Sequence, residues 1–156
     1  MSERAQTSYR RTYPQSSKAV GRARREVVAF AKQCGFSGQQ LADIEVAVGE
    51  GLANAVEHGH RDEGLLEVSV RCVGDTVIVE IKDDGRGFDH GTVCAHAGPP
   101  VEALRGFGTF IMRELMDEVR YSEFGTRLHL RKRLAAVAAA PQVPTASRKN
   151  FERQRS

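Results

Sequence analysis

The chain has 156 residues, of which 40% are hydrophobic and 28% are charged, as is ordinary for a globular protein. The length fits a single domain, and no apolar run reaches the roughly 20 residues that a membrane helix needs. The net charge is +3, but the basic residues gather at the two ends and residues 26–130 are acidic. We therefore expect no membrane span and no direct nucleic-acid binding, and we interpret the basic ends as solvated tails.

The three cysteines are Cys34, Cys72 and Cys94, widely spaced and odd in number. They form no C-x-x-C pair of the kind that binds zinc. The sequence therefore predicts neither a disulfide framework nor a zinc site. The beginning of the chain lacks the apolar centre of a signal peptide, so we expect a cytoplasmic protein.

The first predicted elements are a strand and a helix. "SYRRTYP", residues 8–14, is a short strand that ends at its proline. Residues 16–36 have helical spacing, with Ser16 or Ser17 as the N-cap and Gly35 at the C-terminal end. The apolar residues that share one face of this helix are Val20, Val27, Val28, Phe30 and Ala31.

A second helix is predicted from Ser37 to Gly59, and a hairpin follows it. "LLEVSVRCV" and "TVIVEIKD" alternate between apolar and polar residues, and Gly74-Asp75 between them is typical of a hairpin turn. Next comes a long glycine-rich stretch without periodicity, as in functional loops. "TFIMRELMDEV" is then a short amphipathic helix, and "RYSEF" and "TRLHLRK" are two final strands. This order predicts an α+β two-layer sandwich: a mostly antiparallel sheet with helices on one face.

The second helix carries polar residues four apart, Glu50, Asn54 and His58, which lie on one face. Magnesium prefers oxygen ligands, and a carboxamide together with phosphate oxygens can hold it. A carboxylate one turn away can orient or deprotonate a nucleophile. The alternative is the solvated face of an amphipathic helix. We interpret His58 as a packing residue.

Two glycine-rich stretches add to this pattern. "DDGRGFD" begins at Asp83, where a strand becomes a loop, and a carboxylate there can accept a hydrogen bond from an exocyclic amine such as that of adenine. "RGFGTF", residues 105–110, leads into this last helix, and the amides at a helix N-terminus favour an anion such as phosphate. Each stretch alone is also compatible with an ordinary turn.

The order of these pieces is more specific than any one of them. E-x-x-x-N on a helix, D-x-G-x-G after a strand, G-x-G at a helix and G-T before a strand resemble the ATP-binding domain of gyrases, histidine kinases and heat-shock chaperones (the GHKL superfamily). "GEGLANAVEHG", "DDGRGFD" and "MRELMDEVRY" resemble the anti-sigma factor serine/threonine kinases. The resemblance implies a Bergerat-type ATP-binding fold over residues 9–133, between a flexible N-terminus (1–8) and a basic, disordered tail (134–156).

The resemblance also implies roles for individual residues. Glu50 would act as the base or water-orienting group, and Asn54 would bind magnesium. Asp83 would contact the adenine amine, and Gly85 and Gly87 would shape the adenine site. We assign no role to the neighbouring Asp84.

At the phosphate end, residues 88–104 correspond to the ATP lid, and Thr126 resembles a threonine that reaches adenine through water. The family usually has an apolar residue where this chain has Thr109, whose hydroxyl would cap the helix or touch phosphate. The residues expected at the phosphate end are Arg105, Gly106, Phe107, Gly108 and Thr109.

By resemblance, the chain is an ATP- and Mg²⁺-dependent protein serine/threonine kinase. It would phosphorylate an anti-sigma-factor antagonist protein and sequester a sigma factor, and relatives are commonly homodimers. One alternative is a nucleotide-gated binding module with little or no kinase activity, in which ATP orders the lid. Another is a fragment of a histidine kinase, which is less favoured because nothing before Tyr9 resembles a phospho-accepting helical domain.

Overall fold

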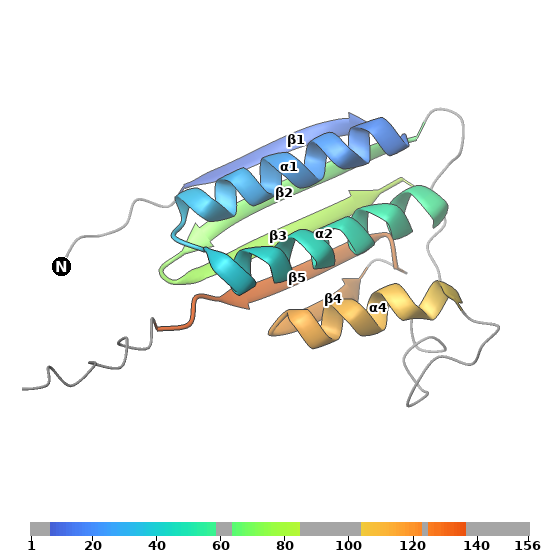
Figure 1. Ribbon diagram of the computed structural model, residues 1–156. Coiled ribbons are helices and arrows are strands. Elements are labelled where there is room, and N and C mark those ends of the chain that lie inside the picture. The colour runs from blue at the N-terminus through green and yellow to red at the C-terminus, as the bar shows by residue number, and fades with distance from the viewer. Residues whose placement is uncertain (1–6, 59–63, 85–103, 123–124, 137–156) are drawn as a thin grey trace, which may run out of the picture.

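The computed structural model describes residues 7–58, 64–84, 104–122 and 125–136, and these ranges form a sheet and three helices (Figure 1). In chain order the elements are β1 (Ser8–Pro14), α1 (Ser17–Gln33), α2 (Gly38–His58), β2 (Leu65–Val73), β3 (Thr76–Asp83), α4 (Leu104–Leu115), β4 (Glu118–Ser122) and β5 (Arg127–Arg133).

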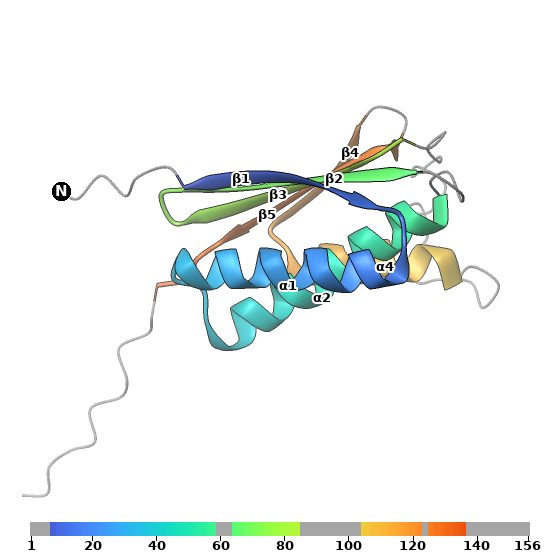
Figure 2. The same cartoon turned by 90° about the horizontal axis from the view of Figure 1, so that it is seen from above.

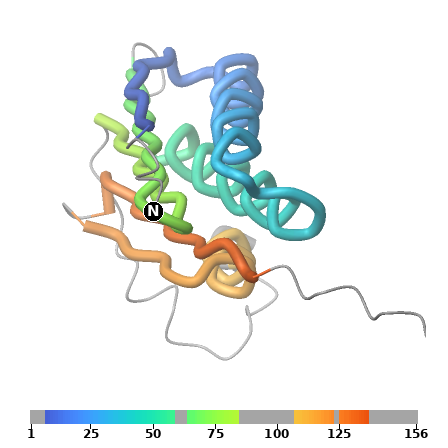
Figure 3. Tube along the Cα trace, turned by 90° about the vertical axis from the view of Figure 1, so that its left-hand side faces the viewer, coloured from blue at the N-terminus to red at the C-terminus, as the bar shows by residue number. Residues whose placement is uncertain are grey.

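The five strands form one sheet in the order β1-β2-β3-β5-β4, and each neighbouring pair is antiparallel. All three helices lie on the same side of the sheet, as Figure 2 and Figure 3 show from two directions. The predicted α+β two-layer sandwich is therefore confirmed. None of the helices in the described ranges is long and apolar enough to cross a membrane.

Helix α1 begins and ends where its sequence indicates. Ser16 is the N-cap, with an extended backbone and a side-chain oxygen that accepts a hydrogen bond from the Ala19 amide at 3.2 Å. Gly35 follows the helix at φ 101°, a conformation that glycine adopts without strain. Of the predicted apolar face, Val20 and Val28 are only partly buried. The residues of α1 that are buried are Ala19, Ala23, Val27, Phe30 and Ala31.

The core lies between α1, α2 and the inner face of the sheet, where apolar residues alternate along β2, β3 and β5. Helix α2 lies close to the sheet at Gly51. A Cβ atom at Gly51 would lie 2.5 Å from Leu128 Cδ2 and 3.2 Å from Ile81 Cδ1. The missing side chain therefore allows α2 to lie directly over β3 and β5.

The C-terminal elements begin earlier than predicted. Helix α4 begins at Leu104 rather than Thr109, and β4 begins at Glu118 rather than Arg120. Glycine disfavours a helix interior, so the pattern predicted that the G-x-G stretch would precede the helix. In the structure Gly106 and Gly108 instead lie within the first turns of α4.

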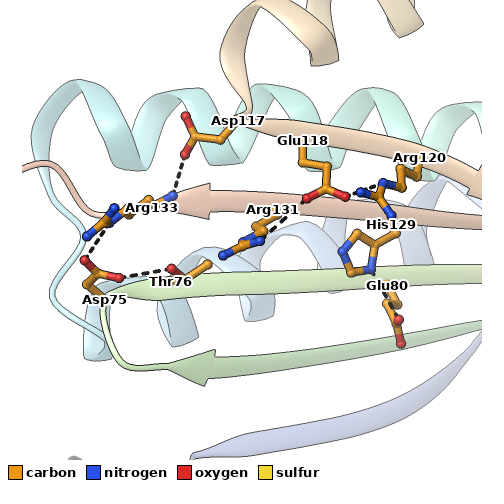
Figure 4. A network of polar contacts seen from close by, with 9 residues as sticks. All are labelled: Asp75, Thr76, Glu80, Asp117, Glu118, Arg120, His129, Arg131 and Arg133. Atoms are coloured by element: carbon orange, nitrogen blue, oxygen red, sulfur yellow. Dashed lines mark hydrogen bonds and ion pairs between the residues drawn. The ribbon is translucent and has the colours of Figure 1, made fainter.

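Ion pairs on the outer face of the sheet connect β5 with its neighbours (Figure 4). His129 Nδ1 lies 3.3 Å from Glu80 Oε1, and Arg133 Nε lies 2.8 Å from Asp75 Oδ2. Partial burial raises the pKa of Glu80, but the hydrogen bond with His129 and the nearby Arg71 outweigh this effect, and the pKa falls below its ordinary value. These contacts complement the backbone ladder of the central strands.

The prediction that disulfides are absent is wrong. Cys34 and Cys72 are joined by a disulfide, with their Cα atoms 6.5 Å apart and a sequence separation of 38. Cys34 caps the C-terminal end of α1, and Cys72 lies near the end of β2. The packing of α1 on the sheet brings these two ends together. The spacing of the cysteines along the chain does not reveal that the two ends are adjacent.

Candidate functional site

The polar stripe of α2 lies at the margin of its buried face. Glu50 and Asn54 are both partly buried, whereas Ala53 and Glu57 of the same helix are exposed. The apolar residues between them, such as Leu52, are in the core. The stripe is therefore not the solvated face of the helix, which was the alternative interpretation of the sequence.

Helix α4 meets this stripe at Gly108. A Cβ atom at Gly108 would lie 2.7 Å from Glu50 Oε2 and 3.5 Å from both Oδ1 and Nδ2 of Asn54. One turn further along α4, Met112 Sδ would lie 3.6 Å from a Cβ atom at Gly51. The absence of a side chain at Gly108 therefore leaves room for two polar side chains between the antiparallel helices α2 and α4.

Asp83 lies at the same end of the sandwich. It is buried, with 7% of its surface exposed, although it is an acidic residue and ends a strand. Helix α2 runs in the same direction as β3 (Figure 1), and Gly51 packs on Ile81. Four helical residues and two strand residues each advance about 6 Å. Asp83 therefore lies level with Ala55, the neighbour of Asn54.

Thr126 is beside Asp83 in the sheet. The Asp83 amide donates a 2.9 Å hydrogen bond to the Thr126 carbonyl, and Asp83 also pairs with Leu66 of β2. The sheet thus places Thr126 next to Asp83. Gly85 and Gly87, which follow Asp83 in sequence, lie outside the described residues.

Asp84, which received no role from the sequence, makes two defined hydrogen bonds. Its Oδ2 accepts a 3.1 Å hydrogen bond from the Leu65 amide, and its Oδ1 accepts one of 3.0 Å from Gln15 Nε2. Asp84 thus connects the end of β3 to the beginning of β2 and the residue after β1. The side chains of successive strand residues point to opposite faces of the sheet. Two adjacent aspartates at a strand end therefore have different neighbours, and this pattern indicates two different roles.

The first turn of α4 holds Arg105 and Gly106, whose side-chain environment is outside the described part of the structure. The first four amides of an α-helix have no partner within the helix, so they are available to an anion. Phe107 and Phe110 are each about half exposed, and their rings stack with centroids 6.3 Å apart. Thr109 is 3% exposed and lies inside the helix, so it does not cap it.

Oxygen donors suited to magnesium lie around Gly108. Magnesium is held by a few protein oxygens together with phosphate oxygens and water, and Asn54 Oδ1 and Glu50 Oε2 are donors of this kind. In the described ranges, this site included, no cluster of three or more His, Cys, Asp or Glu side chains is placed to hold a metal. The donor set at Gly108 therefore fits a metal that arrives with a phosphate ligand.

A two-layer sandwich with these polar groups at one end is the architecture of a histidine kinase-like ATP-binding domain. The family model of the histidine kinase-like ATPase domain matches residues 13–132. The chain therefore belongs to this family, and its resemblance to the anti-sigma factor serine/threonine kinases is confirmed.

Relatives with assigned names agree with this membership. The chain is 33% identical over 132 residues to the serine-protein kinase RsbW of Oceanobacillus iheyensis, which covers 78% of this chain and 84% of the relative. It is 30% identical over 119 residues to RsbW of Halalkalibacterium halodurans, with 72% and 74% covered. RsbW of Staphylococcus aureus is 28% identical over 130 residues, with 76% and 82% covered. Family membership implies that ATP is the nucleotide.

Proposed function

We propose that the protein is an ATP-dependent protein serine/threonine kinase that acts as an anti-sigma regulatory factor. It transfers a phosphoryl group to a serine or threonine of an antagonist protein and binds a sigma factor when the antagonist is phosphorylated. The observation that supports this proposal most strongly is the close approach of Gly108 to Glu50 and Asn54, which brings a carboxylate and a carboxamide of α2 next to the N-terminal turns of α4.

Two residues of α2 carry the chemistry in this proposal. Asn54 offers its side-chain oxygen to Mg²⁺, which neutralises phosphate charge when it is bound. Glu50 accepts the proton of the attacking hydroxyl or orients that hydroxyl, because it lies one turn away on the same face. Phosphoryl transfer depends mainly on positioning and on charge neutralisation, so these two groups suffice for the reaction.

The neighbouring elements hold the rest of the nucleotide. Asp83 accepts a hydrogen bond from the adenine amine, and Thr126 contributes through water. Gly85 and Gly87 allow the backbone to approach the base closely. The phosphates face the N-terminal turns of α4, formed by Arg105, Gly106, Phe107 and Gly108. Thr109 packs inside the site and supports this turn, since its side chain is buried.

The partners are proposed from the relatives alone. The antagonist and the sigma factor would be protein partners in the cytoplasm, and the protein would form a homodimer. Residues 9–133 would be the catalytic domain, and the basic ends at 1–8 and 134–156 would lie outside it. Their removal is expected to leave phosphoryl transfer intact.

The test is transfer of radiolabelled phosphate from ATP to candidate antagonist proteins by the native chain and by Glu50→Gln. The native chain should label a serine or threonine of one antagonist, and Glu50→Gln should reduce the rate at least about 100-fold, in line with the loss of a general base. Glu45→Gln is the matched control, because Glu45 is an exposed glutamate on the same helix.

The same experiment separates the kinase from a binding module. If ATP binds but no antagonist is labelled, or if Glu50→Gln labels it as fast as the native chain, the kinase proposal is wrong. If Glu50→Gln still releases the sigma factor as the native chain does, a nucleotide-gated module is supported instead.

A further inference from the structure

The disulfide between Cys34 and Cys72 has no part in the proposed function. Cys34 is the C-cap residue of α1, and Cys72 is the residue before the last one of β2. Their Cα atoms are 6.5 Å apart, within the usual range for a disulfide. We propose that this pair is a reversible redox site, oxidised by hydroperoxides and reduced by dithiols.

Both cysteines are accessible to small reactants. Each is partly buried, with surface left in contact with solvent. Thiol–disulfide exchange requires a thiolate to reach a sulfur atom, and cysteines fully enclosed by apolar side chains are inert. The exposure of this pair therefore permits both the oxidation and the reduction.

The fold does not depend on this bond for its core. Phe36 and Val70, each two residues from a cysteine, are buried, whereas the cysteines only pack against the margin of the core. Small domains need disulfides when their cores are too small, and a domain of this size can bury a sufficient core without one. We therefore expect the reduced form to stay folded, as a redox switch requires.

The bond fastens three elements at one end of the sandwich. The Cys34 amide donates to the Phe30 and Ala31 carbonyls at the end of α1, and the Cys72 amide donates to the carbonyl of Thr7, just before β1. This end carries the β2–β3 hairpin, whereas Asp83 lies at the opposite end of β3. Oxidation would thus fix α1 and β1 to the sheet without altering the groups of the candidate ATP site.

The oxidation is balanced as follows. The thiolate of one cysteine attacks a peroxide oxygen, the O–O bond breaks, and a sulfenic acid and hydroxide form. The thiolate of the second cysteine then attacks the sulfenic sulfur, the S–S bond forms and hydroxide leaves. The two thiols lose two electrons and two protons, and hydrogen peroxide becomes two waters. A dithiol returns the same electrons and protons on reduction.

The proposed kinase function gives a further reason to expect reversibility. A kinase that uses ATP would work in a reducing compartment, where disulfides that form are usually transient or redox-sensing. This one reason rests on the proposed function, whereas the exposure of the cysteines and the independence of the core do not.

The test uses the full chain with Cys94→Ser as the common background, so that only two thiols remain. The protein is reduced with dithiothreitol, exposed to hydrogen peroxide, alkylated and mapped by mass spectrometry. Cys34 and Cys72 should be linked after oxidation and both free after reduction, through repeated cycles. The reduced form should keep its far-ultraviolet circular dichroism and melt cooperatively, at a temperature about 10 °C lower.

Cys34→Ser and Cys72→Ser are the matching variants, and each should melt like the reduced chain whether or not peroxide is added. Reduced protein that is unfolded would overturn the proposal, because the bond would then be a structural requirement. Failure of the two thiols to link under peroxide would overturn it as well. ATP affinity, measured on both forms, is a separate readout: its absence in both would contradict the proposed function and leave the redox site intact.

Discussion

Gly108 places the strictest steric requirement on the candidate site. An alanine methyl group there would lie 2.7 Å from Glu50 Oε2, so the carboxylate would have to move. Alanine favours a helix over glycine by about 1 kcal/mol. We therefore predict that Gly108→Ala keeps or raises thermal stability while it lowers phosphoryl transfer at least about 10-fold, since a small misplacement of a catalytic group costs this much or more.

Gly21→Ala is the control for this variant. Gly21 lies within α1, and an added Cβ atom would meet only Arg25 Nη1, at an ordinary 3.4 Å. It should show the same gain in helix stability with no change in transfer. Equal activity of Gly108→Ala and the native chain, measured in the same assay, would remove Gly108 from the site.

The two adjacent aspartates at the end of β3 should respond in opposite ways. Asp83→Asn keeps the shape of a buried side chain but replaces an acceptor, so we predict at least 10-fold weaker ATP binding, the scale of one lost hydrogen bond to a charged group. Asp84→Ala removes the acceptor of Leu65 N and Gln15 Nε2 and should cost about 1 kcal/mol of stability, with a smaller effect on ATP. Calorimetry measures ATP affinity and urea unfolding measures stability in both variants. A larger loss of ATP affinity in Asp84→Ala than in Asp83→Asn would contradict the prediction.

At the scale of elements, helix α2 packs closely on the sheet at Gly51. Gly51→Ala would put a methyl group 2.5 Å from Leu128 Cδ2, so α2 must shift away from β3 and β5. Overpacking of this kind costs roughly 1–3 kcal/mol in the free energy of unfolding. Gly49→Ala is the comparison, because its nearest contact is the mobile side chain of Arg24 at 3.3 Å. Equal urea midpoints for the two variants would contradict this packing.

The contact between β1 and α1 should depend on pH. The Tyr13 hydroxyl donates a hydrogen bond to Glu26, and burial, followed by this bond, raises the pKa of Tyr13 from 10.0 to about 12. The Tyr13 hydroxyl is therefore harder to deprotonate in the folded state than in the unfolded state. The stability that Tyr13 contributes is fully present below pH 10 and is lost as the pH rises through about 12.

Tyr13→Phe should flatten this alkaline loss of stability and should lower stability at pH 8 by about 1 kcal/mol, the value of one hydrogen bond. Burial also raises the pKa of Tyr9, which both proteins retain, so the difference between their urea curves isolates Tyr13. Parallel curves between pH 9 and pH 12 would show that Tyr13 does not titrate differently in the folded state.

Elements with strict alternation were predicted best. The bounds of β2 and β3 agree with the predicted segments, because apolar residues in these two strands alternate and Gly74 marks the turn, and β1 also has the predicted bounds, with Pro14 at its end. The beginning of α4 was predicted too late, since helix propensity places glycine outside a helix whereas Gly108 is accommodated by close packing on α2. Tertiary contacts, which propensity does not include, decide such cases.

At the scale of the whole molecule, the fold brings together parts that are distant in sequence. The polar residues of α2, the end of β3 and the start of α4 meet at one end of the sandwich, and the disulfide lies at the other end. The motif order predicted the first grouping, because the elements that carry the motifs have fixed places in the predicted fold. It did not predict the disulfide or the role of Asp84, since both depend on which strand and helix ends are adjacent.

The most direct test of the central claim is isothermal calorimetry of ATP with the native chain and with Asn54→Ala, each with and without magnesium. If Asn54 holds the metal beside Gly108, the native chain should bind ATP more tightly with magnesium, and Asn54→Ala should lose most of that magnesium dependence while it stays folded. A native chain that is folded but binds no ATP, or an Asn54→Ala chain with undiminished magnesium dependence, would contradict the account.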